Sequence, residues 1–260
     1  MMPMKWLLTL GMAVLVAAGV ANRSNAGDWS TIKIGTEGAY APFNYHDAAG
    51  KLQGFDIDLV QALCDRMHAK CEFIAIQFDG IIPALQNGQI DAIATSMAIT
   101  EKRKKVVDFT DRYWIRHARF LSCSSRKMED ISPAALKGVT IGTQQGTVSD
   151  DFLEANYKDA DVRLYKTMDD AYQDASAGRI DLVLAGEAVA YDFMQKPAGK
   201  NCRYVGERLP DGKFFGAGCG IAVRKTDPDL RDKFNAALKE VLADGTYQKI
   251  NAKYFPFSIY

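Results

Sequence analysis

The sequence lacks an excess of charge of either sign. Its 32 basic residues equal its 32 acidic residues, and no basic stripe runs along the chain. Domains that bind nucleic acid carry a clustered basic surface and commonly a pI above 9, whereas the pI of this chain is about 6.8. We therefore expect no nucleic-acid partner.

Histidine is scarce, and the cysteines show no metal-binding spacing. The three histidines, His46, His68 and His117, are far apart in the chain, and no C-x-x-C motif is present. Metal centres and nucleophile–base pairs depend on clusters of such residues. The sequence therefore predicts no metal and no cofactor, and it disfavours an enzyme.

Long hydrophobic runs are absent after the first 26 residues. Lys5 precedes an almost wholly apolar run at residues 6–20, and small residues flank a cleavage point after Ala26. This order is typical of a secretory signal peptide, and the run is short for a membrane span. We expect residues 1–26 to be removed. Loss of Lys5 and Arg23 then leaves 30 basic against 32 acidic residues, a net charge of −2, on a soluble exported protein.

Export makes disulfide bonds plausible for the five cysteines. Cys64 and Cys71 are seven residues apart, between the end of a helical pattern and the start of a strand, and form the natural pair. Cys123, Cys202 and Cys219 cannot be assigned from spacing alone, so a second disulfide stays open. At least one of these three is free or pairs between chains.

Strand and helix patterns alternate along the chain, which predicts an α/β fold with parallel sheets. Strands are expected at residues 31–36, 71–76 and 90–94, with helices beginning near residues 55 and 81. A second series of strands and helices follows. Its expected strands lie at residues 139–143, 162–165 and 180–184, and its expected helices at residues 149–157 and 168–177.

Two short motifs occur twice in the same order. I-G-T stands at residues 34–36 and 141–143, and a Gly-x-Ile-Asp strand motif stands at residues 88–94 and 178–184. The repetition predicts two similar α/β modules, with a ligand held beyond the carboxyl ends of their strands and between the modules. The Gly-rich and then helical tail from residue 213 is too small for a domain. We expect it to cross back to the first module and create a hinge.

The segment of residues 88–109 is the strongest candidate for an anion site. Its strand ends in the hydroxyl-rich Thr95-Ser96, and Thr100 can cap a short helix that contains Arg103. The planar fork of an arginine matches a carboxylate with two parallel hydrogen bonds. The alternative is a surface helix in which Arg103 pairs with Asp108 or Asp111.

Several motifs together resemble a known family over nearly all of residues 31–260. They are Y-A-P-F-N, G-F-D-I-D-L, F-D-G-I-I-P-A-L, I-T-E-K-R, G-R-I-D and D-G-T-Y-x-K. The chain resembles the periplasmic polar amino-acid-binding proteins of ABC importers, above all the lysine/arginine/ornithine and histidine binders. The resemblance implies the type II periplasmic-binding-protein fold, with two lobes of mixed, mainly parallel sheets flanked by helices and two crossover segments as the hinge. Lobe 1 is expected at residues 27–115 plus 213–260, and lobe 2 at residues 116–212.

The resemblance also implies a binding site between the lobes. Arg103 would hold the ligand α-carboxylate together with backbone N–H groups, Tyr40 and Phe78 would enclose the ligand side chain, and Glu37 would pair with its distal cation. The backbone N–H groups assigned to the carboxylate are those of Ser96, Gly146, Thr147 and Val148. The complete expected set of ligand-binding residues is Glu37, Tyr40, Phe78, Thr95, Ser96, Ala98, Arg103, Gln144, Gly146, Thr147, Val148, Gly186 and Glu187.

Three positions depart from the family pattern. Ala98 replaces a serine that accepts from the ligand ammonium, Gly186 replaces an aspartate at the end of the second-lobe strand, and Val148 often is threonine. A buried ammonium without a partner is costly, so two alternatives follow. Either Glu187 turns inward, or the ligand is an opine, whose substituted amine carries a second acid arm that Gly186 and Ala98 would accommodate.

The function predicted on these grounds is import of a cationic amino acid, of the arginine, lysine, ornithine or histidine type, by a periplasmic binding protein. An opine such as octopine or nopaline is the alternative ligand. A dehydratase-like enzyme that uses Glu187 as an acid or base is a more distant alternative. The expected partners are the small-molecule ligand and an inner-membrane ABC permease, and the protein is expected to be a monomer.

Overall fold

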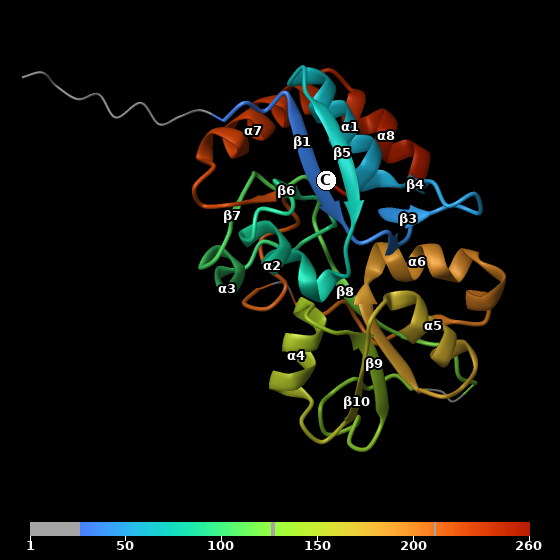
Figure 1. The fold of residues 1–260 in the computed structure, drawn as a ribbon. Helices are drawn as coiled ribbons and strands as arrows, with labels where there is room; N and C mark the ends of the chain where they lie inside the picture. Colours follow the sequence, from blue (N-terminus) through green and yellow to red (C-terminus); the bar gives the residue numbers. More distant parts are fainter. Residues whose placement is uncertain (1–26, 126–127, 211) are drawn as a thin grey trace, which may run out of the picture.

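The computed structural model of the protein describes residues 27–125, 128–210 and 212–260, so the predicted signal peptide lies outside the described residues. The described strands form two five-stranded sheets and one three-stranded sheet. Figure 1 shows the two large sheets in separate parts of the molecule, the first in the upper half of the view and the second in the lower half. We call these parts the first and the second lobe.

The first lobe is built on a sheet that mixes parallel and antiparallel strands. β1 pairs in parallel with β5 and β6, and β13 pairs antiparallel with β6 and β7. The strand order is β5 (Lys70–Ala75), β1 (Thr31–Thr36), β6 (Ala92–Ile93), β13 (Ala222–Val223) and β7 (Asp108–Phe109). Its helices are α1 (Phe55–Arg66), α2 (Ile81–Gln86), α3 (Glu101–Lys104), α7 (Pro228–Ala243) and α8 (Thr246–Tyr254). Helices α1, α7 and α8 pack against one another, and α2 packs on β1 and β6.

The second lobe repeats this arrangement. β9 pairs in parallel with β10 and β11, and β8 pairs antiparallel with β11 and β12. The strand order is β10 (Asp161–Tyr165), β9 (Thr140–Gln144), β11 (Leu182–Gly186), β8 (Ala118–Ser122) and β12 (Arg203–Val205). Its helices are α4 (Val148–Asn156), α5 (Met168–Ser176) and α6 (Glu187–Gln195), and the short 3-10 turns of the two lobes are η1 (Phe78–Gly80) and η2 (Pro197–Gly199). The two mixed sheets flanked by helices confirm the predicted fold class.

The repeated motifs of the sequence make the same contact in each lobe. A Cβ atom on Gly35 of β1 would lie 2.3 Å from the side chain of Ile90, and one on Gly142 of β9 would lie 2.5 Å from Ile180. Each isoleucine belongs to the second repeated motif and each glycine to the first. Glycine is therefore required in β1 and in β9, because the isoleucine two residues before β6 or β11 packs against its bare backbone.

The aspartates of the repeated motif also have equivalent roles. The carboxylate of Asp91 accepts the N–H of Lys33 at 2.9 Å, and the carboxylate of Asp181 accepts the N–H of Thr140 at 3.0 Å. Each bond joins the residue just before β6 or β11 to the first half of the neighbouring strand, β1 or β9. These matched contacts explain why both lobes fold from the same short pattern.

The chain passes between the lobes twice, as the resemblance implied. Strands β1, β5, β6 and β7 lie within residues 31–109, the second sheet spans residues 118–205, and β13 returns to the first sheet. The exact limits of the lobes stay a prediction. A small sheet of β2 (Ala39–Tyr40), β3 (Asn44–His46) and β4 (Leu52–Gln53) follows β1. None of the described helices has the length and apolar character needed to cross a bilayer.

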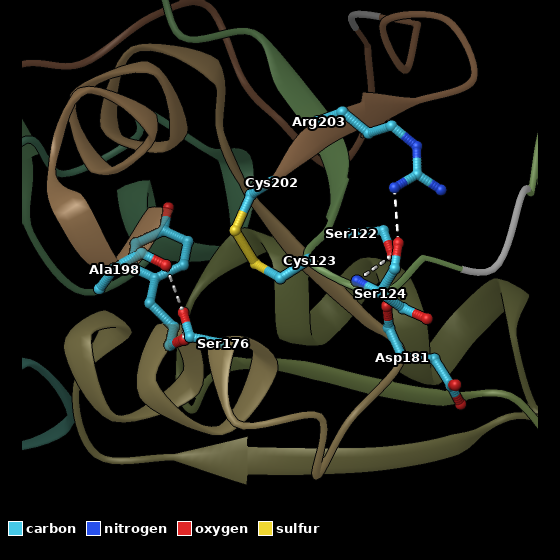
Figure 2. Close-up of a disulfide and its surroundings, with 9 residues drawn as sticks. Ser122, Cys123, Ser124, Ser176, Asp181, Ala198, Cys202 and Arg203 are labelled. Atoms are coloured by element: carbon cyan, nitrogen blue, oxygen red, sulfur yellow. Dashed lines mark hydrogen bonds between the residues drawn. A yellow bond between two sulfur atoms is a disulfide. The ribbon is translucent and has the colours of Figure 1, made fainter. Parts of the chain in front are cut away.

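Two disulfides form, one within each lobe. Cys64 bonds to Cys71 as predicted, and Cys123 bonds to Cys202, a pairing that the sequence left open. Cys219 is a buried free thiol. Figure 2 shows the second disulfide beside Ser122 and Arg203. These two residues are partners in the antiparallel pairing of β8 with β12, which brings the neighbouring cysteines together.

We expect the second disulfide to stabilise the protein more than the first. The bonded cysteines are 79 residues apart in the Cys123–Cys202 pair and 7 apart in the Cys64–Cys71 pair. Loop-closure entropy then predicts a loss of about 4–5 kcal/mol on replacing Cys123 and Cys202 by serine, and of about 2–3 kcal/mol on replacing Cys64 and Cys71. Denaturant unfolding of the two double variants measures the difference, and equal losses would contradict the expectation.

Candidate functional site

A cavity lies between the lobes and is lined by side chains from both. It contains about 320 Å³ of space between protein atoms, its open mouth included, of which about 20 Å³ can hold the centre of a water-sized sphere. The lining residues are Glu37, Tyr40, Phe78, Thr95, Ser96, Ala98, Arg103, Arg116, Gln144, Thr147 and Val148. Every expected site residue is therefore in the lining except Gly146, Gly186 and Glu187. The lining also includes Arg116, which sequence reasoning missed.

Arg103 extends from the short helix α3 toward the second lobe. Thr100 accepts the backbone N–H of Arg103 at 3.2 Å, which is the predicted cap. The guanidinium donates from Nη1 to the carbonyl of Ala98 at 2.9 Å and from Nη2 to the carbonyl of Gly146 at 3.2 Å. The Cζ atom of this guanidinium lies 5.3 Å from the centroid of the Phe78 ring. These contacts hold the fork in one orientation while other N–H donors of the guanidinium stay available.

The charge of Arg103 is not neutralised by the protein. Among the described residues, no carboxylate lies within ion-pair distance of it, and Asp108 pairs instead with Arg231. Burial lowers the pKa of Arg103 to about 10, so the side chain is still a cation at neutral pH. A buried cation without a counterion favours binding of an anion.

The second lobe presents the N-terminus of α4 to the same cavity. The hydroxyl of Thr147 caps the helix by accepting the N–H of Asp150 at 3.4 Å. The first N–H groups of a helix have no acceptor within the helix, and they bind anions well. The N–H of Gly146, however, donates to the Asp150 carboxylate at 2.9 Å. Thr147 and Val148 can therefore serve an anion as expected, whereas the N–H of Gly146 is already engaged.

Ser96 connects the cavity to a buried hydrogen-bond network of the first lobe. Its hydroxyl donates to Asp56 at 3.0 Å, and its N–H donates to the hydroxyl of Tyr113 at 3.0 Å. The expected bond from the Ser96 N–H to a ligand carboxylate is corrected accordingly, because this N–H faces the buried network. Burial raises the pKa of Asp56 to about 6. The hydroxyl of Thr95 accepts the N–H of Glu37 at 3.1 Å, so this loop also positions the acid.

Glu37 is a nearly buried acid, with 9% of its surface exposed. Its carboxylate accepts from the amide of Gln144 at 2.6 Å. Burial raises the pKa of Glu37 to about 7, and the charges of Asp169 and Asp79 act in the same direction. No described cationic side chain lies within ion-pair distance of it. An acid held in this environment favours a ligand that brings its own positive charge.

Tyr40 and Phe78 supply aromatic surface to the cavity. Tyr40 lies in β2 and is buried, and its ring stacks on Phe43 with the ring centroids 5.9 Å apart. Phe78 lies in η1, at the end of the loop after β5. Aromatic faces pack well against aliphatic stems and against guanidinium or ammonium groups.

Arg116 is the functional residue that sequence reasoning missed. It is 7% exposed, its Nη2 donates to the hydroxyl of Ser149 at 3.0 Å, and its Nη1 has no hydrogen-bond partner. A signal was present in the sequence. Arg116 has the same parity as Ala118 and Phe120 at the start of a strand, so alternation places this arginine on a buried face.

Gly186 lies directly beside this arginine. A Cβ atom on Gly186 would be 3.5 Å from Nε of Arg116 and 3.3 Å from the hydroxyl of Tyr40. The space that an acidic side chain would use at this position is therefore next to a cation. The structure thus places a positive charge where the family pattern has an aspartate.

Glu187 lies outside the cavity. The strand ends at Gly186 and α6 begins at Glu187, whose carboxylate pairs with Arg208 at 2.7 Å and with Arg119 at 3.5 Å. Of the two alternatives raised for the α-ammonium, an inward turn of Glu187 is not seen, because both of its ion-pair partners lie outside the cavity lining. Its carboxylate is engaged in these ion pairs and does not line the cavity.

Comparisons with known proteins agree with this geometry. A family model described as bacterial extracellular solute-binding proteins, family 3, matches residues 32–257. The L-arginine-binding protein of Pseudomonas aeruginosa is 42% identical over 88% of this chain and 89% of its own length. The lysine/arginine/ornithine-binding periplasmic protein of Escherichia coli is 39% identical over 96% and 97%. The structure of an ancestral arginine-binding protein bound to arginine superimposes with a TM-score of 0.80 and 38% identity, over 87% of this chain and 98% of that one.

Proposed function

This chain belongs to the bacterial extracellular solute-binding proteins of family 3, and on that premise we propose that it binds a cationic amino acid for import. One observation carries the proposal: Arg103 and Glu37 face the same cavity, both nearly buried and neither with a charged partner among the described residues. An amino acid with a positively charged side chain neutralises both, its α-carboxylate at Arg103 and its distal cation at Glu37.

Closure of the two lobes supports this proposal. Lys102 of the first lobe pairs with Asp151 of the second at 2.7 Å, and Gln145 donates to Asp79 across the same boundary. Arg103 itself reaches Gly146 of the second lobe. A ligand held by residues of both lobes stabilises the closed arrangement, which is the form that a membrane permease would recognise.

The location and partners follow from the same premise. The relatives named above include periplasmic proteins, and the N-terminal sequence has the pattern of a signal peptide. We propose that this protein acts in the periplasm and delivers its ligand to an ABC permease, as a monomer that binds no nucleic acid. The relatives are named as binding proteins, and the ion-paired Glu187 argues against the dehydratase alternative.

Titration of the mature protein with arginine, lysine, ornithine and histidine tests this function. At a ligand concentration of 100 Kd, binding stabilises the native state by about 2.7 kcal/mol. For a protein of this size we expect a rise in Tm of about 5–10 °C. Glutamate and leucine serve as matched controls, because neither brings a cation to Glu37. No rise with any cationic amino acid or derivative would refute the proposed ligand class.

A further inference from the structure

The cavity has one more positive charge than a simple cationic amino acid needs. Its charged lining residues are Glu37, Arg103 and Arg116, one acid and two cations. Arginine as a ligand carries a distal cation, an α-carboxylate and an α-ammonium. The first two satisfy Glu37 and Arg103. The ammonium is then left with a cation as its neighbour, and no described lining residue other than Glu37 offers it a carboxylate.

Arg116 has the properties of a receptor for a second anion. It is buried to more than nine-tenths, and its Nη1 makes no hydrogen bond. No described carboxylate lies within ion-pair distance of it. Its Nη2 donates to the Ser149 hydroxyl at 3.0 Å, its carbon Cζ lies 5.7 Å from the centroid of the Phe215 ring, and the Tyr40 hydroxyl interacts with it, so the guanidinium is held at the first turn of α4. A buried cation with a free donor costs stability unless a ligand neutralises it.

The surroundings of Arg116 are also unsuited to an ammonium. Gly186 supplies no side chain, Ala98 supplies no hydroxyl, and the carbonyl of Ala98 already accepts from Arg103. The hydroxyl of Tyr40 lies beside Gly186 and can donate to an anion at the same place. The α-nitrogen region of the site is therefore built to receive negative charge.

We propose that Arg116 binds a second carboxylate, and that the ligand is a cationic amino acid whose α-nitrogen carries a carboxylate-bearing substituent. The inference deepens the proposed function, because the same Glu37 and Arg103 hold the rest of the ligand. Each carboxylate then meets one arginine, and the substituted amine lies between two acid groups of its own molecule. The opine class that the sequence raised on grounds of space is thus supported by charge.

Calorimetric titration with two probes tests this inference. The probes are L-arginine and N2-(1-carboxyethyl)-L-arginine, which differ only in the acid arm. We expect the wild-type protein to bind the carboxyethyl compound at least about tenfold more tightly, a difference of about 1.4 kcal/mol, because close charge pairs buried in an interface can show coupling energies of this size or larger. Arg116→Ala should reverse the preference: affinity for the carboxyethyl compound falls about a hundredfold, and affinity for arginine rises as the repulsion is removed.

Two further variants show whether the effect is specific to Arg116 and to the charge at its position. Arg208→Ala removes an arginine that pairs with Glu187 outside the cavity, and it should leave both affinities unchanged. The double variant Arg116→Ala with Gly186→Asp supplies an acid for a primary ammonium and should bind arginine more tightly than either single variant. Gly186 is the N-cap of α6 with φ −64° and ψ 134°, a position where aspartate is favourable, so this variant should fold.

The possible outcomes distinguish a failure of the Arg116 inference from a failure of the proposed function. If the wild-type protein binds arginine more tightly than the carboxyethyl compound, the inference fails and the proposed function stands. If Arg116→Ala weakens both probes equally, Arg116 shares the α-carboxylate with Arg103, and the inference also fails. If neither probe nor any cationic amino acid binds, the proposed function fails as well.

Discussion

Replacing Arg103 by alanine is expected to lower the affinity for the amino-acid ligand by about a hundredfold or more. The guanidinium is oriented by two backbone carbonyls and by the Phe78 ring, and no carboxylate of the described chain competes for it. Removing one partner of a buried, hydrogen-bonded charge pair costs about 2–5 kcal/mol. Calorimetric titration with arginine measures the loss.

Two matched variants define what the Arg103 result means. Arg103→Lys keeps the charge and loses the planar fork, so we expect an intermediate affinity. Lys102→Ala removes the neighbouring cation of the same helix, whose side chain is 77% exposed in its pair with Asp151. An exposed pair contributes little, so this variant should stay within about threefold of wild type. If Arg103→Ala behaved like Lys102→Ala, Arg103 would not anchor the carboxylate.

The sequence could predict the fold because its two lobes use the same local signals. Gly35 and Gly142 permit close packing of an isoleucine from the next strand, and that isoleucine stands in a recognisable motif in each lobe. The helical tail predicted after the Gly-rich segment is present as α7 at Pro228–Ala243 and α8 at Thr246–Tyr254. Most strands and helices could therefore be predicted from local sequence patterns, and their arrangement in two lobes from the order of these patterns along the chain.

The site was harder to predict, because it depends on which groups already have partners. Ser96 lines the cavity and Gly146 directly precedes the lining residue Thr147, yet the N–H of each donates within the protein. Glu187 begins a helix one residue after the strand ends, and arginines from distant segments turn it away. The Cys123–Cys202 bond likewise depends on the pairing of β8 with β12. Partners that are distant in the sequence cannot be predicted from the spacing of residues.

Lowering the pH from 8 to 6 is expected to weaken arginine binding about tenfold. Burial holds the pKa of Glu37 at about 7 in the ligand-free protein, and only the ionised carboxylate can pair with the guanidinium of the ligand. Below pH 7 the acid must release a proton before it binds, so affinity falls by about a factor of ten for each further pH unit. Arginine itself stays charged throughout this range.

Glu37→Gln should remove both the cation preference and most of this pH dependence. The amide has nearly the shape of the carboxylic acid, so the cavity is preserved while its negative charge is lost. We expect arginine affinity at pH 8 to fall about a hundredfold, since the ligand cation then loses its buried partner. Affinity for glutamine, whose side chain carries no charge, should change much less. Calorimetry at pH 6, 7 and 8 on both proteins measures these effects.

The stability of the ligand-free protein provides the control for Glu37→Gln. Because the folded-state pKa of Glu37 lies above its unfolded value near 4.5, the unfolded state loses this proton first as the pH rises. Glu37 therefore destabilises the ligand-free protein progressively from about pH 4.5 to pH 7, and Glu37→Gln should raise the Tm at pH 8. If the variant is more stable yet binds arginine poorly, the role of Glu37 is to pair with the ligand and not to stabilise the fold. Unchanged arginine affinity at pH 8 would instead place the distal cation elsewhere.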